Sequence, residues 1–269
     1  MAYADLKKRL AAGDVIVLDG ATGTELERRG APMDPAAWCG PATLENDHIL
    51  VDIHSDYIEA GSEIVTSNTY AASRLMLKEA GLADRSEEII QRAVEAALSA
   101  RKRTGANEVV VAASLSHMVP MSAGTAVIDP AKIPSPAEIS DAFHALAHTA
   151  KAAGAELIML EMMYEPARVK LAVEAALSTG LPVWFGMSGR RGKDGKVVSF
   201  HHFEDLPISA IASLIPQTGI DAAGLMHTGP ELIGPALQEM KPFFDGPLMA
   251  YPDSGYFEMP GWRFVDIIP

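Results

Sequence analysis

Seven polar residues stand where short apolar runs of the sequence end. They are Asp19, Asn68, His117, Glu161, Ser188, His227 and Asp253. Carboxylates and imidazoles can hold a cationic ligand, move a proton or bind a metal ion. If the runs are parallel strands, their carboxyl ends meet at one edge of the sheet, which is where such folds bind ligands. One polar residue at a strand end usually caps a loop, whereas seven together indicate a binding or catalytic site.

The apolar runs themselves predict the strands that position these residues. They cover residues 15–20, 63–70, 109–115, 157–163, 182–189, 221–229 and 247–255. Within each run the apolar residues are continuous rather than alternating, as is typical of parallel strands that are covered on both faces. The sequence therefore predicts seven buried parallel strands.

Helical signals lie between the runs. The stretch "SPAE" at 135–138 combines a serine N-cap, a proline at the first helical position and a glutamate three residues after the cap. The stretches "EAGSEIV" (59–65) and "AAGAELI" (152–158) each end a helix on glycine and then enter a strand. Another helical pattern places four residues near one face, namely Leu44, Ile49, Ile53 and Tyr57.

The alternation of strands and helices predicts an α/β fold of the TIM (β/α)8-barrel type, with residues 1–269 as a single domain. Seven strands are visible in the sequence, and the eighth is missing or atypical. A doubly wound sheet that binds a dinucleotide is disfavoured, because no GxGxxG pattern follows the first run.

Composition narrows the classes of partner. The formal net charge of −13 argues against nucleic acid and anionic membranes, which attract basic surfaces. Mean hydropathy is only +0.11, and no apolar run is long enough to cross a bilayer. The single cysteine, Cys39, excludes an internal disulfide, and the charged amino-terminal stretch lacks the apolar core of a secretory signal. We therefore expect a cytoplasmic protein with small-molecule partners, and a homo-oligomer remains open.

Several motifs together resemble the homocysteine S-methyltransferase family. They are "VIVLDGATGTELERRG" (15–30), Trp38, "HSDYIEAGSEIVTSNTY" (54–70), "AGAELIMLEMM" (153–163), "GPLMAYPDSG" (246–255) and Trp262. The resemblance covers nearly the whole chain in order. It implies a TIM barrel that moves a methyl group from an onium donor, such as betaine, S-methylmethionine or S-adenosylmethionine, to the thiol of homocysteine.

The resemblance also implies roles for individual residues. Asp19 and the backbone of Gly20 would lie under the amino-acid end of the acceptor, and Glu161 would hold its ammonium group. Trp38 and Tyr70 would lie near the donor. Aromatic faces suit this role physically, because a quaternary ammonium or sulfonium group has no N–H to donate.

Asn68 has two interpretations. It either contacts substrate or only bridges backbone groups in the second strand–helix loop.

His227 departs from the family pattern. In the family, the corresponding strand ends on the first of three zinc-binding cysteines, and an adjacent Cys pair after the last strand supplies the other two. Here the first position is His227, and the only cysteine lies beside Trp38. Zinc is therefore expected only if a Cys pair follows Pro269, since His and two Cys form a plausible zinc set.

Two other interpretations of His227 remain. It contacts substrate or loop residues without a metal, or it joins His117, Glu161 and Asp253 around a harder metal such as iron or manganese.

The predicted function is methyl transfer from an onium donor to a homocysteine-like thiol or a related small acceptor, with His227 and Glu161 as catalytic residues. Two alternatives stay open. One is a metal-dependent enzyme of another class that uses His and carboxylate ligands at the barrel rim. The other is a non-catalytic homologue that binds small molecules.

Overall fold

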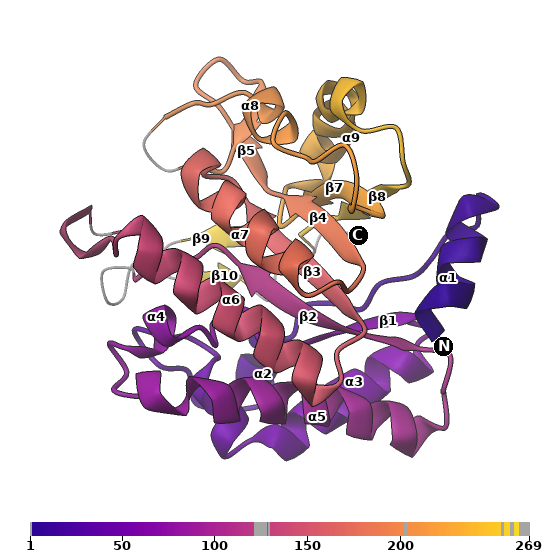
Figure 1. Cartoon of the computed structure of the whole chain (residues 1–269), viewed down its shortest axis with the longest axis vertical. Coiled ribbons are helices and arrows are strands. Elements are labelled where there is room, and N and C mark those ends of the chain that lie inside the picture. The colour runs from indigo at the N-terminus through magenta and orange to yellow at the C-terminus, as the bar shows by residue number, and fades with distance from the viewer. Residues whose placement is uncertain are drawn as a thin grey trace.

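Six parallel strands form the central sheet of the computed structural model, in the order β1-β2-β3-β4-β7-β8 (Figure 1). The structure describes residues 2–120, 128, 130–201, 204–253, 256–258 and 261–263. The strands are β1 (Ile64–Ser67), β2 (Val110–Ser116), β3 (Leu157–Met163), β4 (Val183–Met187), β7 (Ala222–Met226) and β8 (Leu248–Tyr251). All five pairings are parallel, which gives the curled sheet of a TIM-like barrel.

The sequence predicted these six strands correctly to within a few residues, but the first run behaves differently. Residues 15–20 form no regular strand. They meet the sheet through one parallel bridge between Leu18 and Ile64. Val15 and Val17 are 83% and 48% exposed, so this run is covered on one side only and the prediction of a buried strand was wrong there.

Alternate residues of the strands face two different cores. One set packs beneath the surrounding helices and includes Val111, Leu160 and Phe185. The other set points to the inside of the curled sheet and includes Val110 and Met159. The strands are thus covered on both faces, which explains their continuous apolar sequence.

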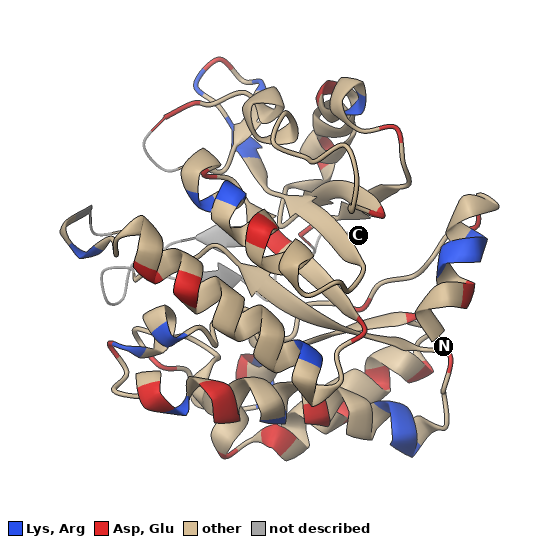
Figure 2. Cartoon of the chain, in the orientation of Figure 1, with Lys and Arg blue, Asp and Glu red and all other residues tan. Residues whose placement is uncertain are grey.

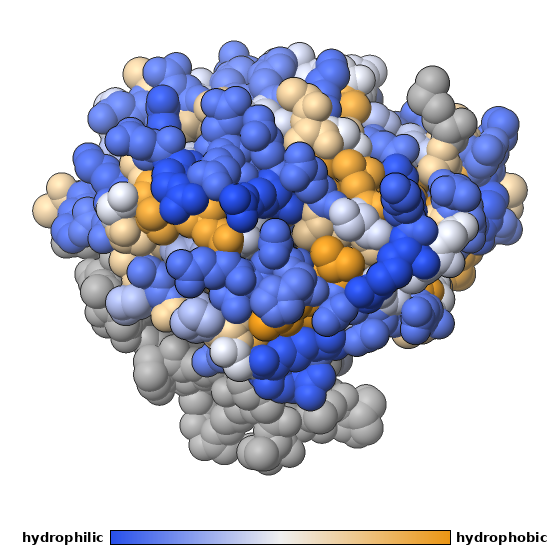
Figure 3. All heavy atoms as spheres, turned by 90° about the horizontal axis from the view of Figure 1, so that it is seen from below, coloured by the Kyte–Doolittle hydropathy of each residue, from blue (hydrophilic) through white to orange (hydrophobic). Residues whose placement is uncertain are grey.

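Helices cover the outer face of the sheet (Figure 1). The longer ones are α3 (Asp47–Glu59), α5 (Ser86–Thr104), α6 (Pro136–Ala153), α7 (Pro166–Ser178) and α9 (Pro230–Met240). The described residues also form shorter helices, not all of them on this face, namely α1 (Ala2–Ala11), α2 (Gly23–Arg28), α4 (Arg74–Leu77) and α8 (Ile208–Ala212). Charged residues lie mainly on helices and loops (Figure 2). The face seen from below is mostly hydrophilic, with separate hydrophobic patches (Figure 3).

The predicted helix ends are confirmed. Ser135 caps α6, its side chain accepts from the Glu138 amide, and the Glu138 carboxylate accepts from the Ser135 amide, so the capping box is complete. Gly154 ends α6 with φ of 109°, and Gly61 follows α3 with φ of 106°. Both values need glycine, which is why the same joint recurs in the sequence.

Helix α1 closes the amino-terminal end of the curled sheet. Tyr3 and Leu6 are buried in the inner core. The Tyr3 hydroxyl donates to Asp221 Oδ2 at 2.7 Å and accepts from Trp184 Nε1 at 3.0 Å. Helix α1 therefore covers the amino-terminal end of the strands. The predicted site lies at the opposite, carboxyl-terminal end.

Two short hairpins complete the described fold. Strands β5 (Gly189–Arg191) and β6 (Val197–Ser199) pair antiparallel, so residues 189–199, which include four basic side chains, form a hairpin. Strands β9 (Tyr256–Glu258) and β10 (Gly261–Arg263) also pair antiparallel. Trp262 belongs to β10, but its side chain lies outside the described part of the structure. No described helix is both long enough and apolar enough to cross a membrane.

Candidate functional site

Glu161 and His227 meet at the carboxyl ends of the strands. Glu161 lies near the end of β3, and His227 follows β7 directly. His227 Nε2 is 2.7 Å from Glu161 Oε1, and its Nδ1 is 3.8 Å from Asp253 Oδ1 in the loop after β8. The exposed fractions of the three side chains are only 22%, 13% and 20%. The structure thus brings together three of the seven predicted residues.

The two carboxylates set the charge of His227. Burial lowers the pKa of the imidazole, but Asp253 and Glu161 outweigh it and raise the pKa to about 10. At neutral pH the ring is therefore an imidazolium, with Nε2–H donating to Glu161.

Asp19 is a third carboxylate at this end of the sheet. Its side chain accepts from the Thr66 amide at 2.6 Å and from the Thr66 hydroxyl at 3.2 Å. Burial raises the pKa of Asp19 to about 8, the charge of Glu161 adds to this, and the Thr66 hydrogen bonds oppose it. Asp19 is thus close enough to Glu161 for their charges to interact, and the site is rich in carboxyl groups.

Gly20 follows Asp19 and lies directly against Tyr57 of α3. A Cβ atom at Gly20 would be 2.6 Å from the Tyr57 hydroxyl oxygen, so no other residue fits here without movement. Tyr251 of β8 lies on another side of the site, with its ring centroid 5.7 Å from that of His227. Sequence patterns did not indicate that these two tyrosines contact the site, because their helical and strand positions are equally typical of core residues.

Trp38 and Tyr70 form an aromatic pair. Their ring centroids are 6.1 Å apart at an interplanar angle of 87°, and both side chains are partly exposed. The Tyr70 hydroxyl donates to Met162 Sδ at 3.0 Å, and Met162 directly follows Glu161 in β3. The aromatic pair and the carboxylates therefore share the same end of the sheet.

Asn68 is held in a buried network. Its amide nitrogen donates to the Cys39 carbonyl and to Thr43 Oγ1, both at 3.0 Å. Its amide oxygen accepts from Cys39 Sγ at 3.2 Å. Both amide protons are thus engaged within the protein, which favours the bridging interpretation of Asn68. Burial also raises the pKa of the Cys39 thiol well above its usual range.

Two other predicted residues anchor loops. His117 Nε2 accepts from the backbone amides of Tyr164 and Glu165 at 3.1 and 3.0 Å. Ser188 donates from Oγ to the Met226 carbonyl at 2.8 Å, just before His227. Nε2 of His117 thus already accepts two hydrogen bonds. The structure does not support the predicted place of His117 beside His227 in a metal site.

Three bulky residues near the site have left-handed backbone conformations. The φ angles are 49° at Trp38, 62° at Met162 and 45° at His227. Side chains with a Cβ rarely adopt this region, and such strain is concentrated at functional sites. At Met162 it accompanies an irregularity in the pairing of β3 with β4.

The donors around His227 do not fit a zinc–thiolate site. The neighbours of the ring are the carboxylates of Glu161 and Asp253, and the Cys39 thiol is bonded to Asn68 instead. Within the described residues, no group of three or more His, Cys, Asp or Glu side chains is arranged to hold a metal ion. No reaction step through zinc follows from this arrangement.

Comparisons with known proteins agree on one family. A family model described as homocysteine S-methyltransferase matches residues 16–265. Homocysteine S-methyltransferase 4 of Zea mays is 27% identical and aligns with 91% of this chain and 74% of its own length. Homocysteine S-methyltransferase of Escherichia coli strain K12 is also 27% identical and aligns with 93% of this chain and 81% of its own length.

One solved structure supports the fold. The metallated form of the homocysteine methyltransferase MmuM from Escherichia coli superposes with a TM-score of 0.75 and 24% sequence identity. The match covers 93% of this chain and 87% of that chain. The predicted TIM-type barrel is thereby confirmed.

Proposed function

The chain belongs to the homocysteine S-methyltransferase family, and from this premise we propose that it transfers a methyl group from an onium donor to the thiol of homocysteine or a close analogue. One observation carries the proposal: the contact of 2.7 Å between Glu161 and His227 at the carboxyl ends of the strands. This contact places an anion for the acceptor's ammonium group beside a cation for the acceptor's sulfur.

In this proposal the acceptor's ammonium group binds to the carboxylate of Glu161. Among described residues, Oε1 of Glu161 is the atom that contacts His227, so Oε2 remains for the ammonium. The pKa of Asp19, about 8, keeps that residue largely protonated at neutral pH, so Glu161 carries the negative charge that meets the ammonium group. A charge-assisted contact of this kind contributes about 1.5–3 kcal/mol to binding.

The donor's cationic group suits the aromatic pair of Trp38 and Tyr70. Each contact between a cation and an aromatic face contributes about 0.5–2 kcal/mol, depending on how far water is excluded. The carboxylates of Glu161 and Asp253 add long-range attraction for the positive charge of an onium group.

His227 activates the acceptor in this proposal. A free thiol has a pKa of about 8.5, and a neighbouring imidazolium lowers it. His227 Nδ1 is 3.8 Å from Asp253 Oδ1, an ion-pair contact longer than a hydrogen bond, and the acceptor's sulfur would approach this side of the ring. The thiol then loses its proton to water.

The thiolate attacks the methyl carbon as the bond from carbon to the onium atom breaks. The bonding pair stays with the departing atom, which leaves as a neutral amine or thioether. The protein's part is to hold sulfur and carbon in line at about 3–3.5 Å.

The test is turnover with defined substrates. Purified protein is incubated with homocysteine and S-methylmethionine, betaine or S-adenosylmethionine, and methionine is measured by mass spectrometry. We expect methionine with at least one donor. A protein that binds these compounds without turnover would be the non-catalytic alternative. Methionine formation that depends on a stoichiometric metal, measured in the same samples, would assign the activation of the thiol to that metal instead of His227.

A further inference from the structure

The turn that carries Asp19 into the site is weakly supported by the sheet. The preceding residues form no regular strand; they meet the sheet through the bridge between Leu18 and Ile64 and through the Glu63 amide, which donates to the Val17 carbonyl at 2.8 Å. Asp19 itself is fixed by its amide, which donates to the Ile64 carbonyl at 3.0 Å, and by its carboxyl contacts to Thr66. Beyond Asp19 the contact with β1 is much weaker, since the Thr22 hydroxyl is 3.5 Å from the Thr66 carbonyl.

Tyr57 reaches this turn from outside the sheet. Its hydroxyl donates to the Ala21 carbonyl at 3.0 Å. Its ring fills the space that a side chain at Gly20 would need, with ring and hydroxyl atoms 2.6–2.8 Å from the missing Cβ. Tyr57 therefore contacts two consecutive residues of the turn, one by a hydrogen bond and one by packing.

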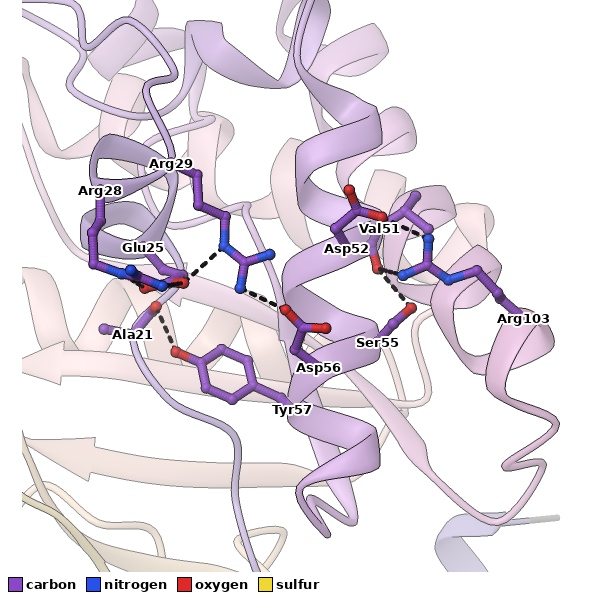
Figure 4. A network of polar contacts seen from close by, with 10 residues as sticks. All are labelled: Ala21, Glu25, Arg28, Arg29, Val51, Asp52, Ser55, Asp56, Tyr57 and Arg103. Atoms are coloured by element: carbon purple, nitrogen blue, oxygen red, sulfur yellow. Dashed lines mark hydrogen bonds and ion pairs between the residues drawn. The ribbon is translucent and has the colours of Figure 1, made fainter.

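The helix that carries Tyr57 is itself fixed to the element after the turn. Arg29, which follows α2, donates to Glu25 of α2 and to Asp56 of α3, both at 2.7 Å (Figure 4). On its other side α3 is bound to α5, because Arg103 donates to Asp52 Oδ1 at 2.6 Å. The turn thus lies between two helices that are tied to each other, and Tyr57 is the side chain that joins it to α3.

Tyr57 remains a donor at neutral pH. Burial raises the pKa of its hydroxyl to about 12, with a further contribution from the charge of Asp19. The phenol is thus protonated at every pH at which the enzyme would work.

We propose that Tyr57 is a positioning residue that holds the turn from Asp19 to Ala21 in the conformation that receives the acceptor. The inference rests on the proposed function, because it assigns the turn to the acceptor's amino-acid end. Tyr57 acts through Asp19 and Gly20 and does not take part in methyl transfer.

The experiment removes only the hydroxyl. In Tyr57→Phe we expect the acceptor KM to rise about three- to ten-fold, the range that corresponds to one net hydrogen bond. We expect kcat at saturating acceptor and the donor KM to stay within two-fold. Hydrogen exchange followed by mass spectrometry should become faster in peptides that contain residues 19–22.

Tyr3→Phe is the matched control. It removes a hydroxyl of the same kind at the other end of the sheet, where it donates to Asp221. Its melting temperature should fall, while its acceptor KM and the exchange of residues 19–22 should not change.

The two measurements separate the possible outcomes. Unchanged exchange at residues 19–22 in Tyr57→Phe would overturn the inference, whatever the activity. Faster exchange with an unchanged acceptor KM would also overturn it, because Tyr57 would then be only structural. If the unmodified protein neither binds nor methylates homocysteine, the proposed function is wrong and the functional part of this inference falls with it, although the exchange measurement still decides whether Tyr57 holds the turn.

Discussion

The two ends of the curled sheet use similar residues in opposite ways. At the amino-terminal end, Asp221 is bonded to the Tyr3 hydroxyl and to Lys7, so its charge is matched. At the carboxyl-terminal end, Asp19 is buried close to another carboxylate, Glu161, and its pKa is raised to about 8, chiefly by burial. The first arrangement stabilises the fold. The second keeps Asp19 largely protonated at neutral pH, so ionising it costs stability unless a cationic ligand is bound beside it.

Backbone strain follows the same division. Left-handed φ angles at residues with a Cβ occur at Trp38, Met162 and His227, all near the carboxyl-terminal end. Such conformations persist only where the surrounding structure enforces them. The comparison therefore makes a testable claim: substitutions at the carboxyl-terminal end should change activity, whereas those at the amino-terminal end should change stability.

His227→Asn should have the largest effect. Asparagine tolerates a left-handed backbone, so the fold should remain, but the imidazolium beside the acceptor's sulfur is lost. We expect kcat/KM to fall by about 100- to 1,000-fold, as when one charge-stabilising donor is removed from an active site. Steady-state kinetics with circular dichroism as a check on folding measures this. A folded variant with full activity would show that His227 takes no part in the reaction.

Glu161→Gln should have the next largest effect. The amide keeps the shape of the side chain but not the charge that pairs with the acceptor's ammonium. We expect acceptor affinity to fall about ten- to one-hundred-fold, and the melting temperature to change little, because the amide still accepts from His227 and the imidazolium keeps Asp253 as a charged neighbour. Calorimetric titration with homocysteine measures the affinity. A collapse of stability with intact affinity per folded molecule would make Glu161 structural.

How much of this site the sequence could predict depends on the range of the interactions. The capping box at Ser135 and the joint at Gly154 are local, so the sequence identified them. The contact between Glu161 and His227 followed from strand topology, because both residues end parallel strands. Residue type and position alone could not reveal that His117 binds two backbone amides or that Asn68 bridges Cys39 and Thr43. These hydrogen bonds join residues that are far apart in the sequence, and they depend on how the loops pack.

Asp19→Asn and Asp221→Asn should change stability in opposite directions. The pKa of Asp19 in the folded protein, about 8, lies above its ordinary value of 3.8, so the folded state keeps a proton that the unfolded chain loses. The stability due to Asp19 is fully present below pH 3.8 and is lost as the pH rises towards 8. Asp19→Asn should therefore raise the melting temperature at pH 7, and this gain should shrink towards pH 4.

Asp221→Asn is the counterpart at the other end. It weakens the contacts to Tyr3 and Lys7, so the free energy of unfolding should fall by about 1–2 kcal/mol. Thermal melts of both variants between pH 4 and 8 test the pair. Changes of the same sign at pH 7 would contradict the division between the two ends.

Lys7→Gln should have the smallest effect. Lys7 Nζ is 2.8 Å from Asp221 Oδ1, but the lysine side chain is 59% exposed, so water and salt screen the pair. We expect a loss of less than about 1 kcal/mol in the free energy of unfolding, measured by urea denaturation. The loss should vanish in about 1 M salt, where the screening length is near 3 Å, and kcat/KM should not change. A measurable loss of activity in Lys7→Gln would show that the amino-terminal end is coupled to the site after all.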